Sequence, residues 1–247
     1  MHLQVKLWDT ASRRLLACLD AGRPTPTTLD PIVGFAFDST HLLSGTRHGS
    51  LHLWDLASAT LLSSARAAHH QGQQVTCVLA LPPGITTGGD GHMFATGGQD
   101  GRVNIFDTRA AACVQRIACH ADAARGTTAA VGCLEAAGPF LCSGGADGRV
   151  CVMDARVGFG VVKGFDYHGG AGGAAPVCAL KAAGGAGRSV LFSGGGDGMV
   201  LAYDLRSMAL CYGLHANRGG VRCLASGDDG NVVVAAGDDG KALVYSY

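Results

Sequence analysis

The chain has 247 residues, of which 47% are hydrophobic and 15% are charged, and its formal net charge is zero. Charged residues usually make up about 25% of a globular protein, so this chain is poor in them. Its lysines and arginines are scattered, which excludes a general nucleic-acid or acidic-membrane binder, because such proteins carry a basic footprint.

The N-terminal residues alternate between polar and apolar as a strand does, and they do not resemble a signal peptide. No apolar run approaches the length of about 18 residues that a membrane-spanning helix needs. We therefore expect a protein of the cytoplasm or the nucleus, with no membrane contact and with reduced thiols.

The ten cysteines form no Cys-x-x-Cys pair and no cluster with histidine at zinc-ligand spacing. Three of them, Cys77, Cys133 and Cys223, recur at the third position of a Val-x-Cys-apolar strand. Buried cysteine behaves as a small hydrophobe. We therefore expect neither disulfides nor a metal site, and no cofactor.

In chain order, a strand-like segment over 2–9 is followed by a second over 13–19, and a longer unit then repeats five times. Each unit has a turn of small residues and glycine, then an alternating strand that ends on an aromatic residue or Met. These end residues are Trp8, Trp54, Phe106, Met153, Tyr203 and Tyr245, spaced 46, 52, 47, 50 and 42 residues apart. Such a period indicates one supersecondary unit that needs its neighbours to bury its faces.

The best-defined unit contains four short runs with strand character, separated by Gly, Asp or Pro. These runs are 131–134, 140–143, 149–153 and 160–163. Four antiparallel strands in a period of about 40–45 residues are typical of a propeller blade. We expect a single all-β domain with blades at approximately 1–19 (partial), 32–66, 74–119, 130–165, 177–214 and 220–247.

On these residues the chain resembles the WD-repeat β-propeller family. The resemblance is carried by Leu7-Trp8-Asp9, by Leu53-Trp54-Asp55, and by the endings Phe106-Asp107, Met153-Asp154 and Tyr203-Asp204. It implies five complete four-stranded blades plus a partial N-terminal blade. It also implies a non-catalytic scaffold that binds other proteins or peptides.

In this family a buried hydrogen-bonded set of His, Ser or Thr, Asp and Trp often holds a blade together. Carried over residue by residue, the resemblance assigns the following sets: His70, Thr96 and Asp100; His120, Ser143 and Asp147; His168, Ser193 and Asp197; His215 and Asp239; and Ser44 with Trp54. Phe106, Met153, Tyr203 and Tyr245 stand in the Trp place. In the blade of Trp54, His48 occupies the Asp position and no upstream His is evident.

The chain begins at the turn between a blade's second and third strands, because the turn Asp lies six residues before the aromatic residue in the other copies. Two ring closures are open. Segment 13–19 could supply the outer strand of the last blade and close a five-bladed ring. Alternatively, the chain is an N-terminally truncated part of a six- or seven-bladed ring, which is the interpretation we favour.

The recurring His, Ser and Asp could suggest a hydrolase triad, but they recur in several blades, which a single active site would not require. The glycine-rich turns are not followed by the Gly-Lys-Ser/Thr of a P-loop. The acidic pairs 228–229 and 238–239 lack the remaining carboxylates of a calcium loop. We therefore predict no enzyme activity, although a propeller enzyme or small-ligand binder with a central-channel site, or a truncated product without independent function, remains an alternative.

Two sets of surface residues are candidates for binding a partner. On the face that carries the turn Asp, the candidates are Arg47, Gln99, Asp238 and the inner-strand Arg222. On the opposite face, three successive blades end in aromatic-or-Met, Asp, x, Arg, which places Arg109, Arg156 and Arg206 at equivalent positions. This pattern is similar to the WDxR motif of substrate receptors that dock on the adaptor of cullin-4 ubiquitin ligases, and it suggests a role in ubiquitination.

Overall fold

The computed structural model describes residues 4–20, 30–83, 85, 92–122, 126–170, 173–183, 189–215, 217–227 and 231–246. Within these ranges the chain forms β-strands and two short 3-10 turns, η1 (His70–Gly72) and η2 (Ala155–Val157). None of the described segments is a helix that could cross a membrane. Residues 1–3, at the predicted cut in the first blade, and the acidic pair at 228–229 lie outside these ranges.

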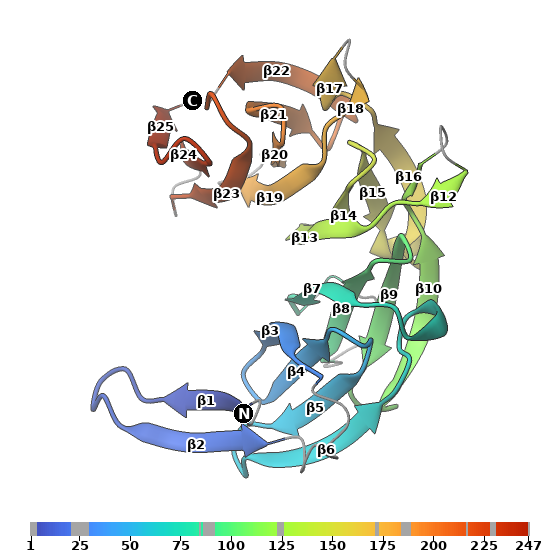
Figure 1. Ribbon diagram of the computed structural model, residues 1–247, viewed down its shortest axis with the longest axis vertical. Coiled ribbons are helices and arrows are strands. Elements are labelled where there is room, and N and C mark those ends of the chain that lie inside the picture. Colours follow the sequence, from blue (N-terminus) through green and yellow to red (C-terminus); the bar gives the residue numbers. More distant parts are fainter. Residues whose placement is uncertain are drawn as a thin grey trace.

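Four antiparallel sheets of four strands follow one another around an arc (Figure 1). Blade 1 is β3 (Ile32–Phe37), β4 (His41–Thr46), β5 (Leu51–Asp55) and β6 (Thr60–Ala65). Blade 2 is β7 (Val75–Ala80), β8 (Met93–Gly98), β9 (Arg102–Asp107) and β10 (Ala112–Ala118). Blade 3 is β13 (Val131–Ala137), β14 (Phe140–Gly145), β15 (Val150–Asp154) and β16 (Gly160–Phe165). Blade 4 is β19 (Val177–Ala183), β20 (Val190–Gly195), β21 (Met199–Asp204) and β22 (Ala209–His215).

A fifth sheet and a hairpin lie at the two ends of the arc. Blade 5 has three strands, β23 (Val221–Ser226), β24 (Val232–Gly237) and β25 (Ala242–Ser246), and the hairpin pairs β1 (Gln4–Trp8) with β2 (Leu15–Asp20). Two further pairs of two-residue strands lie in loops, β11 (Ala121–Asp122) with β12 (Thr127–Thr128), and β17 (Gly169–Gly170) with β18 (Gly173–Ala174). The all-β propeller class is confirmed, but four of the described blades have four strands, where the sequence predicted five.

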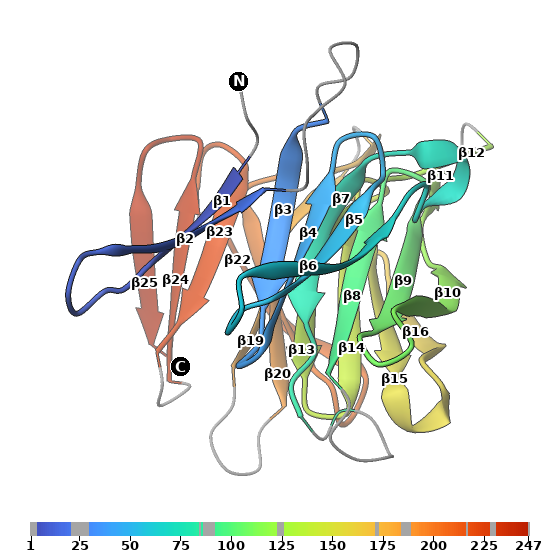
Figure 2. The same cartoon turned by 90° about the horizontal axis from the view of Figure 1, so that it is seen from below.

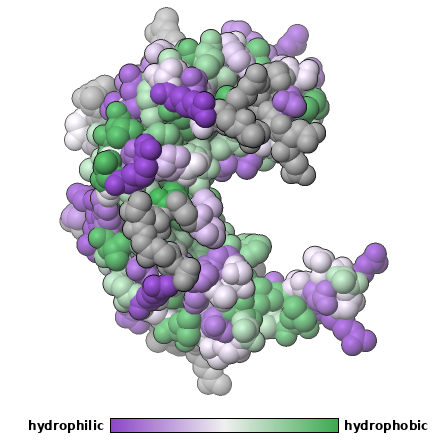
Figure 3. Space-filling view, turned by 180° about the vertical axis from the view of Figure 1, so that it is seen from behind, coloured by the Kyte–Doolittle hydropathy of each residue, from purple (hydrophilic) through white to green (hydrophobic). Residues whose placement is uncertain are grey.

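The hairpin packs against blade 1, and this bears on one of the two predicted ring closures. Val5 and Leu19 of the hairpin form an apolar cluster with Leu42 and Trp54 of blade 1. Strand β2 is therefore the neighbour of β1 rather than the outer strand of blade 5, so the predicted closure of a five-bladed ring through 13–19 is wrong. Figures 1 and 3 show the result, an arc with a wide opening between the hairpin and blade 5.

The core lies between blades rather than within them. The inner strands β3, β7, β13, β19 and β23 line the inside of the arc, and each contacts the inner strand of the next blade. The first residue of four of these strands is almost completely buried: Val75, Val131, Val177 and Val221 are at most 1% exposed. The blades thus bury one another's faces, which is why the repeat needs its neighbours.

Blade 3 shows why blades 2, 3 and 4 carry two consecutive glycines at the end of the second strand. A Cβ on Gly144 would lie 2.6 Å from Val177 of the next blade, and a Cβ on Gly145 would lie 2.2 Å from the His120 ring. Both distances are far shorter than any carbon contact can be. The first glycine admits the next blade, and the second admits a buried histidine.

The molecule has two faces, which we call the top and the bottom, as they lie in Figure 2. The top face carries the connections between blades and the turns between the second and third strands. The bottom face carries the turns between the first and second strands and between the third and fourth. Because the strands of each blade alternate in direction, equivalent turns of all blades lie on the same face.

All ten cysteines are free. Cys142 and Cys151 are buried as expected, and burial raises the pKa of the Cys77 and Cys119 thiols to about 11. Cys18, Cys211 and Cys223 are exposed, so the prediction that the cysteines serve as buried hydrophobes is wrong for these three. Cys223 is exposed because the arc is open, and among the described residues no further blade packs against the outer face of β23.

Candidate functional site

Blade 3 contains a buried network of His, Ser and Asp. Nδ1 of His120 lies 2.9 Å from Oδ1 of Asp147, and its Nε2 lies 2.9 Å from the Ser143 hydroxyl. The same carboxylate accepts hydrogen bonds from the backbone amides of Ala121 and Arg149. The network therefore ties the top-face turn to the segment that enters the blade.

Blade 2 has the same network, with His69 in place of the predicted His70. Nδ1 of His69 lies 2.9 Å from Oδ1 of Asp100, and Nε2 lies 3.0 Å from the Thr96 hydroxyl. His70 is exposed, and its backbone amide donates to Asp100. The prediction of His70 is wrong by one residue. The Asp100 carboxylate binds the backbone amide of His70, whereas the imidazole of the network belongs to His69, the residue before it.

Blade 4 adds a fourth member to the network. Nε2 of His168 lies 2.6 Å from the Ser193 hydroxyl, and Nδ1 lies 3.1 Å from Asp197. Ser193 also donates to the hydroxyl of Tyr203, 3.2 Å away. Tyr203 is fully buried, and burial raises the pKa of its phenol. A tyrosine thus supplies the polar contact that the family obtains from tryptophan.

Blade 5 uses Asn217 where the sequence predicted His215. Nδ2 of Asn217 donates to Oδ1 of Asp239 at 2.7 Å, and the amide of Arg218 donates to Oδ2 at 3.1 Å. His215 is the last residue of the outer strand β22 and its side chain is exposed. The prediction is wrong because β22 continues through His215, so the chain enters the blade two residues later.

In blade 1 the entering segment supplies the carboxylate and the turn supplies the histidine, the reverse of blades 2, 3 and 4. The carboxylate comes from Asp30, which enters the blade, and it accepts from the Thr46 hydroxyl at 2.7 Å and from Nδ1 of His48 at 3.0 Å. Trp54 completes the blade, since its Nε1 donates to the Ser44 hydroxyl at 3.3 Å. Asp30 was not predicted from the sequence, because the resemblance implies a histidine in the entering segment.

The networks use the polar groups that a hydrolase would need for chemistry. Burial alone would raise the pKa of Asp100 and Asp147, but hydrogen bonds from their histidines and from backbone amides outweigh it and hold both below the usual value. The hydroxyls of Thr96, Ser143 and Ser193 are fully buried and already bonded to histidine. These sets hold turns in place and present no nucleophile to solvent.

The predicted candidates at the turns between the second and third strands lie on the top face. Arg47, Gln99 and Asp238 are exposed, and their backbone amides donate to carbonyls of the segments that enter the blades. Arg222 forms a two-pronged ion pair with Asp238, with both N–O distances 2.8 Å. Arg222 and Asp238, two of the four candidates, therefore pair with each other.

On the bottom face, the Asp of each predicted Asp-x-Arg motif closes a turn. The carboxylates of Asp107, Asp154 and Asp204 accept from the backbone amide two residues later, at distances of 2.8–2.9 Å. Asp9 and Asp55 close their turns in a similar way. The aspartate that follows the aromatic residue is thus explained by turn geometry.

The three bottom-face arginines differ in what their guanidinium groups contact. Arg156 folds back on Asp154, with an N–O distance of 2.7 Å, and also lies over the Phe140 ring. Arg109 and Arg206 are exposed, and among the described residues no side chain forms an ion pair with either. Among the described residues, these two of the three arginines are therefore the ones available to a partner.

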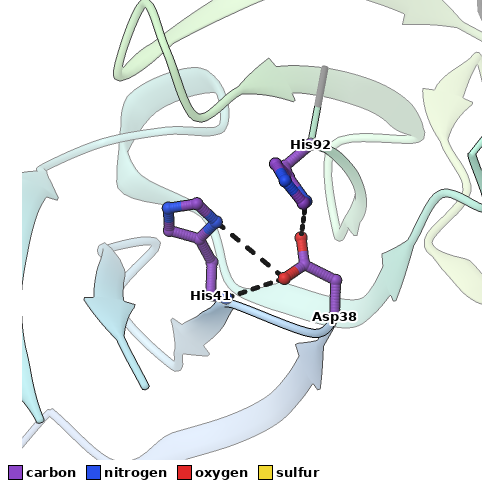
Figure 4. A group of neighbouring side chains, drawn as sticks. All are labelled: Asp38, His41 and His92. Atoms are coloured by element: carbon purple, nitrogen blue, oxygen red, sulfur yellow. Dashed lines mark hydrogen bonds and ion pairs between the residues drawn. The ribbon is translucent and has the colours of Figure 1, made fainter. Parts of the chain in front are cut away.

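Two further features lie between blades 1 and 2. A small apolar hollow of about 30 Å³ is lined by residues that include Leu51, Phe94 and Phe106, and it reaches the turn at Thr108. Near the same turn, Asp38, His41 and His92 gather their polar atoms within 4.8 Å of one another (Figure 4). This cluster was not predicted from the sequence, because its members come from two blades and only Asp38-x-x-His41 is a local signal.

The fold and the buried hydrogen-bond networks together define a propeller of repeated blades whose top-face turns are held in place. A family model described as WD domain, G-beta repeat matches residues 63–107 and 209–246. The chain is 28% identical over 105 residues to the methylosome protein WDR77 of Xenopus laevis. That match covers 42% of this chain and 29% of the relative.

Two segments of this chain are therefore similar to WD repeats. Both matched segments run from an outer strand into the next blade, so each joins two neighbouring sheets. WD-repeat domains typically serve as non-catalytic scaffolds that bind other proteins, and this chain is similar to them in fold and in its buried sets.

Proposed function

We propose that this chain is a protein-interaction scaffold that docks through its bottom face on the adaptor of a cullin-type ubiquitin ligase. The observation that carries the proposal is the repeated Asp-closed turn that presents Arg109 and Arg206 with free guanidinium groups. Arginine offers five donors in a planar fork that suits carboxylates and carbonyl groups. The same turn in blade 3 holds Arg156 against Asp154 and contributes least.

The hollow beside Arg109 adds an apolar contact to this surface. It is lined by Leu43, Leu53, Phe106 and Thr108, among other residues, and Asp107 lies at its rim. A partner segment that places an apolar side chain next to an acidic one would fit the hollow and the arginine together. Such anchored contacts usually carry most of the binding free energy of an interface.

The test is co-purification of the adaptor with the chain and with the triple variant Arg109→Ala, Arg156→Ala and Arg206→Ala. We expect binding to fall at least about tenfold, which corresponds to about 1.4 kcal/mol. The matched control is Arg47→Ala with Arg218→Ala, which removes exposed charge from the top face. The proposal is wrong if the triple variant retains the adaptor as well as the control does.

A second candidate function follows from the relative whose printed name describes a methylosome protein. The matched stretch supports a scaffold role in an assembly of that kind. The same two variants would then be compared for co-purification with methylosome components. Loss of these components from the top-face variant alone would favour this second function over adaptor docking.

A further inference from the structure

Asp38, His41 and His92 form a cluster that joins two blades on the bottom face. Asp38 lies in the turn between β3 and β4, His41 is the first residue of β4, and His92 directly precedes β8 of the next blade. Figure 4 shows that the two imidazole rings face the same carboxylate. Nδ1 of His92 lies 2.7 Å from Oδ2 of Asp38, and Nδ1 of His41 lies 3.9 Å from Oδ1.

The backbone holds each of the three residues in position. The Asp38 carboxylate accepts hydrogen bonds from the amides of Thr40 and His41, both at 2.7 Å. The carbonyl of His92 accepts from the amide and the hydroxyl of Thr108, at 3.1 and 3.0 Å. The turns of two blades thus orient three ligand atoms before any ligand arrives, which lowers the cost of binding one.

We propose that Asp38, His41 and His92 bind a divalent transition-metal ion of the zinc class. Two imidazole nitrogens and one carboxylate oxygen suit such an ion better than Mg²⁺ or Ca²⁺, which prefer oxygen ligands. With metal–ligand distances of about 2.0–2.2 Å, neighbouring ligand atoms of a tetrahedral site lie about 3.3 Å apart. The observed separations of 2.7 and 3.9 Å lie on either side of that value.

The ion can reach the site from solvent. The side chain of His92 is 35% exposed, and those of His41 and Asp38 are 19% and 18% exposed. Three protein ligands leave a fourth position of a tetrahedral ion for water or for a side chain of a partner. To bind the ion, His92 gives up its hydrogen bond to Asp38 and His41 gives up the one to the Thr40 hydroxyl.

The location gives the ion a structural consequence. His92 belongs to the segment that enters β8, and its carbonyl is bonded to Thr108, which lies next to Arg109. A metal ion would therefore bind blade 1 to blade 2 beside one of the proposed docking arginines. This inference does not depend on the proposed function, because the ion would bind whether or not the arginines meet an adaptor.

The test is titration of the purified chain with Co²⁺ at neutral pH, followed by its visible absorption, and then displacement by Zn²⁺. We expect saturation at one ion per chain, a spectrum of nitrogen and oxygen ligands, and bleaching by Zn²⁺. Thermal unfolding should also shift to higher temperature with saturating Zn²⁺, because the ion binds the folded state.

The variants are His41→Gln, His92→Gln and Asp38→Asn, and the last keeps an oxygen that can accept the amides of the turn. Each should weaken Co²⁺ binding at least about 100-fold. His48→Gln is the matched control, since His48 also lies 3.0 Å from a carboxylate but has no second histidine partner. Circular dichroism checks that each variant is folded.

Three outcomes would overturn the proposal. The first is the absence of saturable binding. The second is an absorption band of thiolate coordination, which would place the ion on the exposed cysteines. The third is unchanged binding in folded His41→Gln and His92→Gln variants, which would reduce the cluster to an ion pair between blades.

Discussion

Blade 3 and blade 1 both connect a top-face turn to the segment that enters the blade, but the carboxylate comes from opposite sides. In blade 3 the turn supplies Asp147 and the entering segment supplies His120. In blade 1 the entering segment supplies Asp30 and the turn supplies His48. The charge-assisted contact is kept while its two partners exchange places.

One backbone position explains the difference. Gly145 of blade 3 corresponds to Thr46 of blade 1, since each ends the second strand of its sheet. A side chain at Gly145 would collide with the imidazole of His120, whereas Thr46 carries a hydroxyl that donates to Asp30. A blade that lacks this glycine cannot hold the buried histidine, and a shorter carboxylate side chain takes its place.

The substitution with the largest expected effect on this comparison is Gly145→Ala. Its Cβ would lie 2.2 Å from the His120 ring, so the ring must leave the network. We expect a loss of about 3 kcal/mol in the free energy of unfolding, from overpacking and from a buried carboxylate that loses its partner. Urea denaturation measures it. Gly34→Ala is the control, because its nearest atom would be 3.8 Å away and little should change.

A second test removes the negative charge from each blade in turn. Asp147→Asn should cost about 2 kcal/mol, because the carboxylate accepts from His120 and from two backbone amides in a site that is almost buried. Asp30→Asn should cost about 1 kcal/mol, since the Asp30 side chain is 25% exposed. Equal losses in urea denaturation would contradict the idea that blade 3 depends more on its network.

A third test uses pH and the histidine of blade 4. Burial lowers the pKa of His168 below its usual value, and Asp197 offsets only part of this shift. As the pH falls, the unfolded chain binds the proton first, so stability should decrease from about pH 6.5 down to the lowered pKa of the folded state. Each unit of separation is worth about 1.4 kcal/mol.

The variant His168→Gln should reduce this slope in the pH dependence of urea denaturation, and His52, whose pKa burial also lowers, should account for part of what remains. The control is Asp30 of blade 1, whose contribution to stability changes in a lower pH range. Hydrogen bonds to its carboxylate outweigh the effect of burial and lower its pKa. Its contribution is present above pH 4 and is lost only as the pH falls through the lowered value. A slope near pH 6 that is unchanged in His168→Gln would exclude His168 as a source of it.

The smallest expected effect concerns the bottom-face turns, in which both kinds of blade are alike. Ala111 and Ala59 adopt the left-handed conformation, with φ of 48° and 55°. Ala111→Gly should raise the free energy of unfolding by at most about 0.5 kcal/mol, since relief of strain exceeds the entropy cost only slightly. Ala112→Gly, in the adjoining strand, should lower it by about 0.5–1 kcal/mol.

Some site residues could not be assigned from the sequence because two candidates were equivalent in spacing. His69 and His70 are neighbours, and the interval to Asp100 does not separate them, since the corresponding intervals in other blades differ by several residues. Only burial distinguishes them, with His69 1% exposed. Asn217 escaped notice for a similar reason, because an amide can replace an imidazole as a donor to Asp239.

The Asp38, His41 and His92 cluster shows a different limit. Its members are 54 residues apart at the longest interval and belong to two blades. The blade period alone does not say which bottom-face turns meet across a blade boundary. A site built between repeats therefore leaves almost no local signal in the chain.

The sequence by itself determined the class of fold, the number of repeated units and the turn residues of each. It could do so because hydrophobic alternation, paired glycines and the terminal Asp act within one repeat, over a few residues. The tertiary structure decided that β2 belongs to the hairpin on blade 1, that Asp30 replaces histidine there, and that three polar side chains meet between blades. These outcomes depend on which faces pack together, and packing between distant segments is fixed only when the blades bury one another.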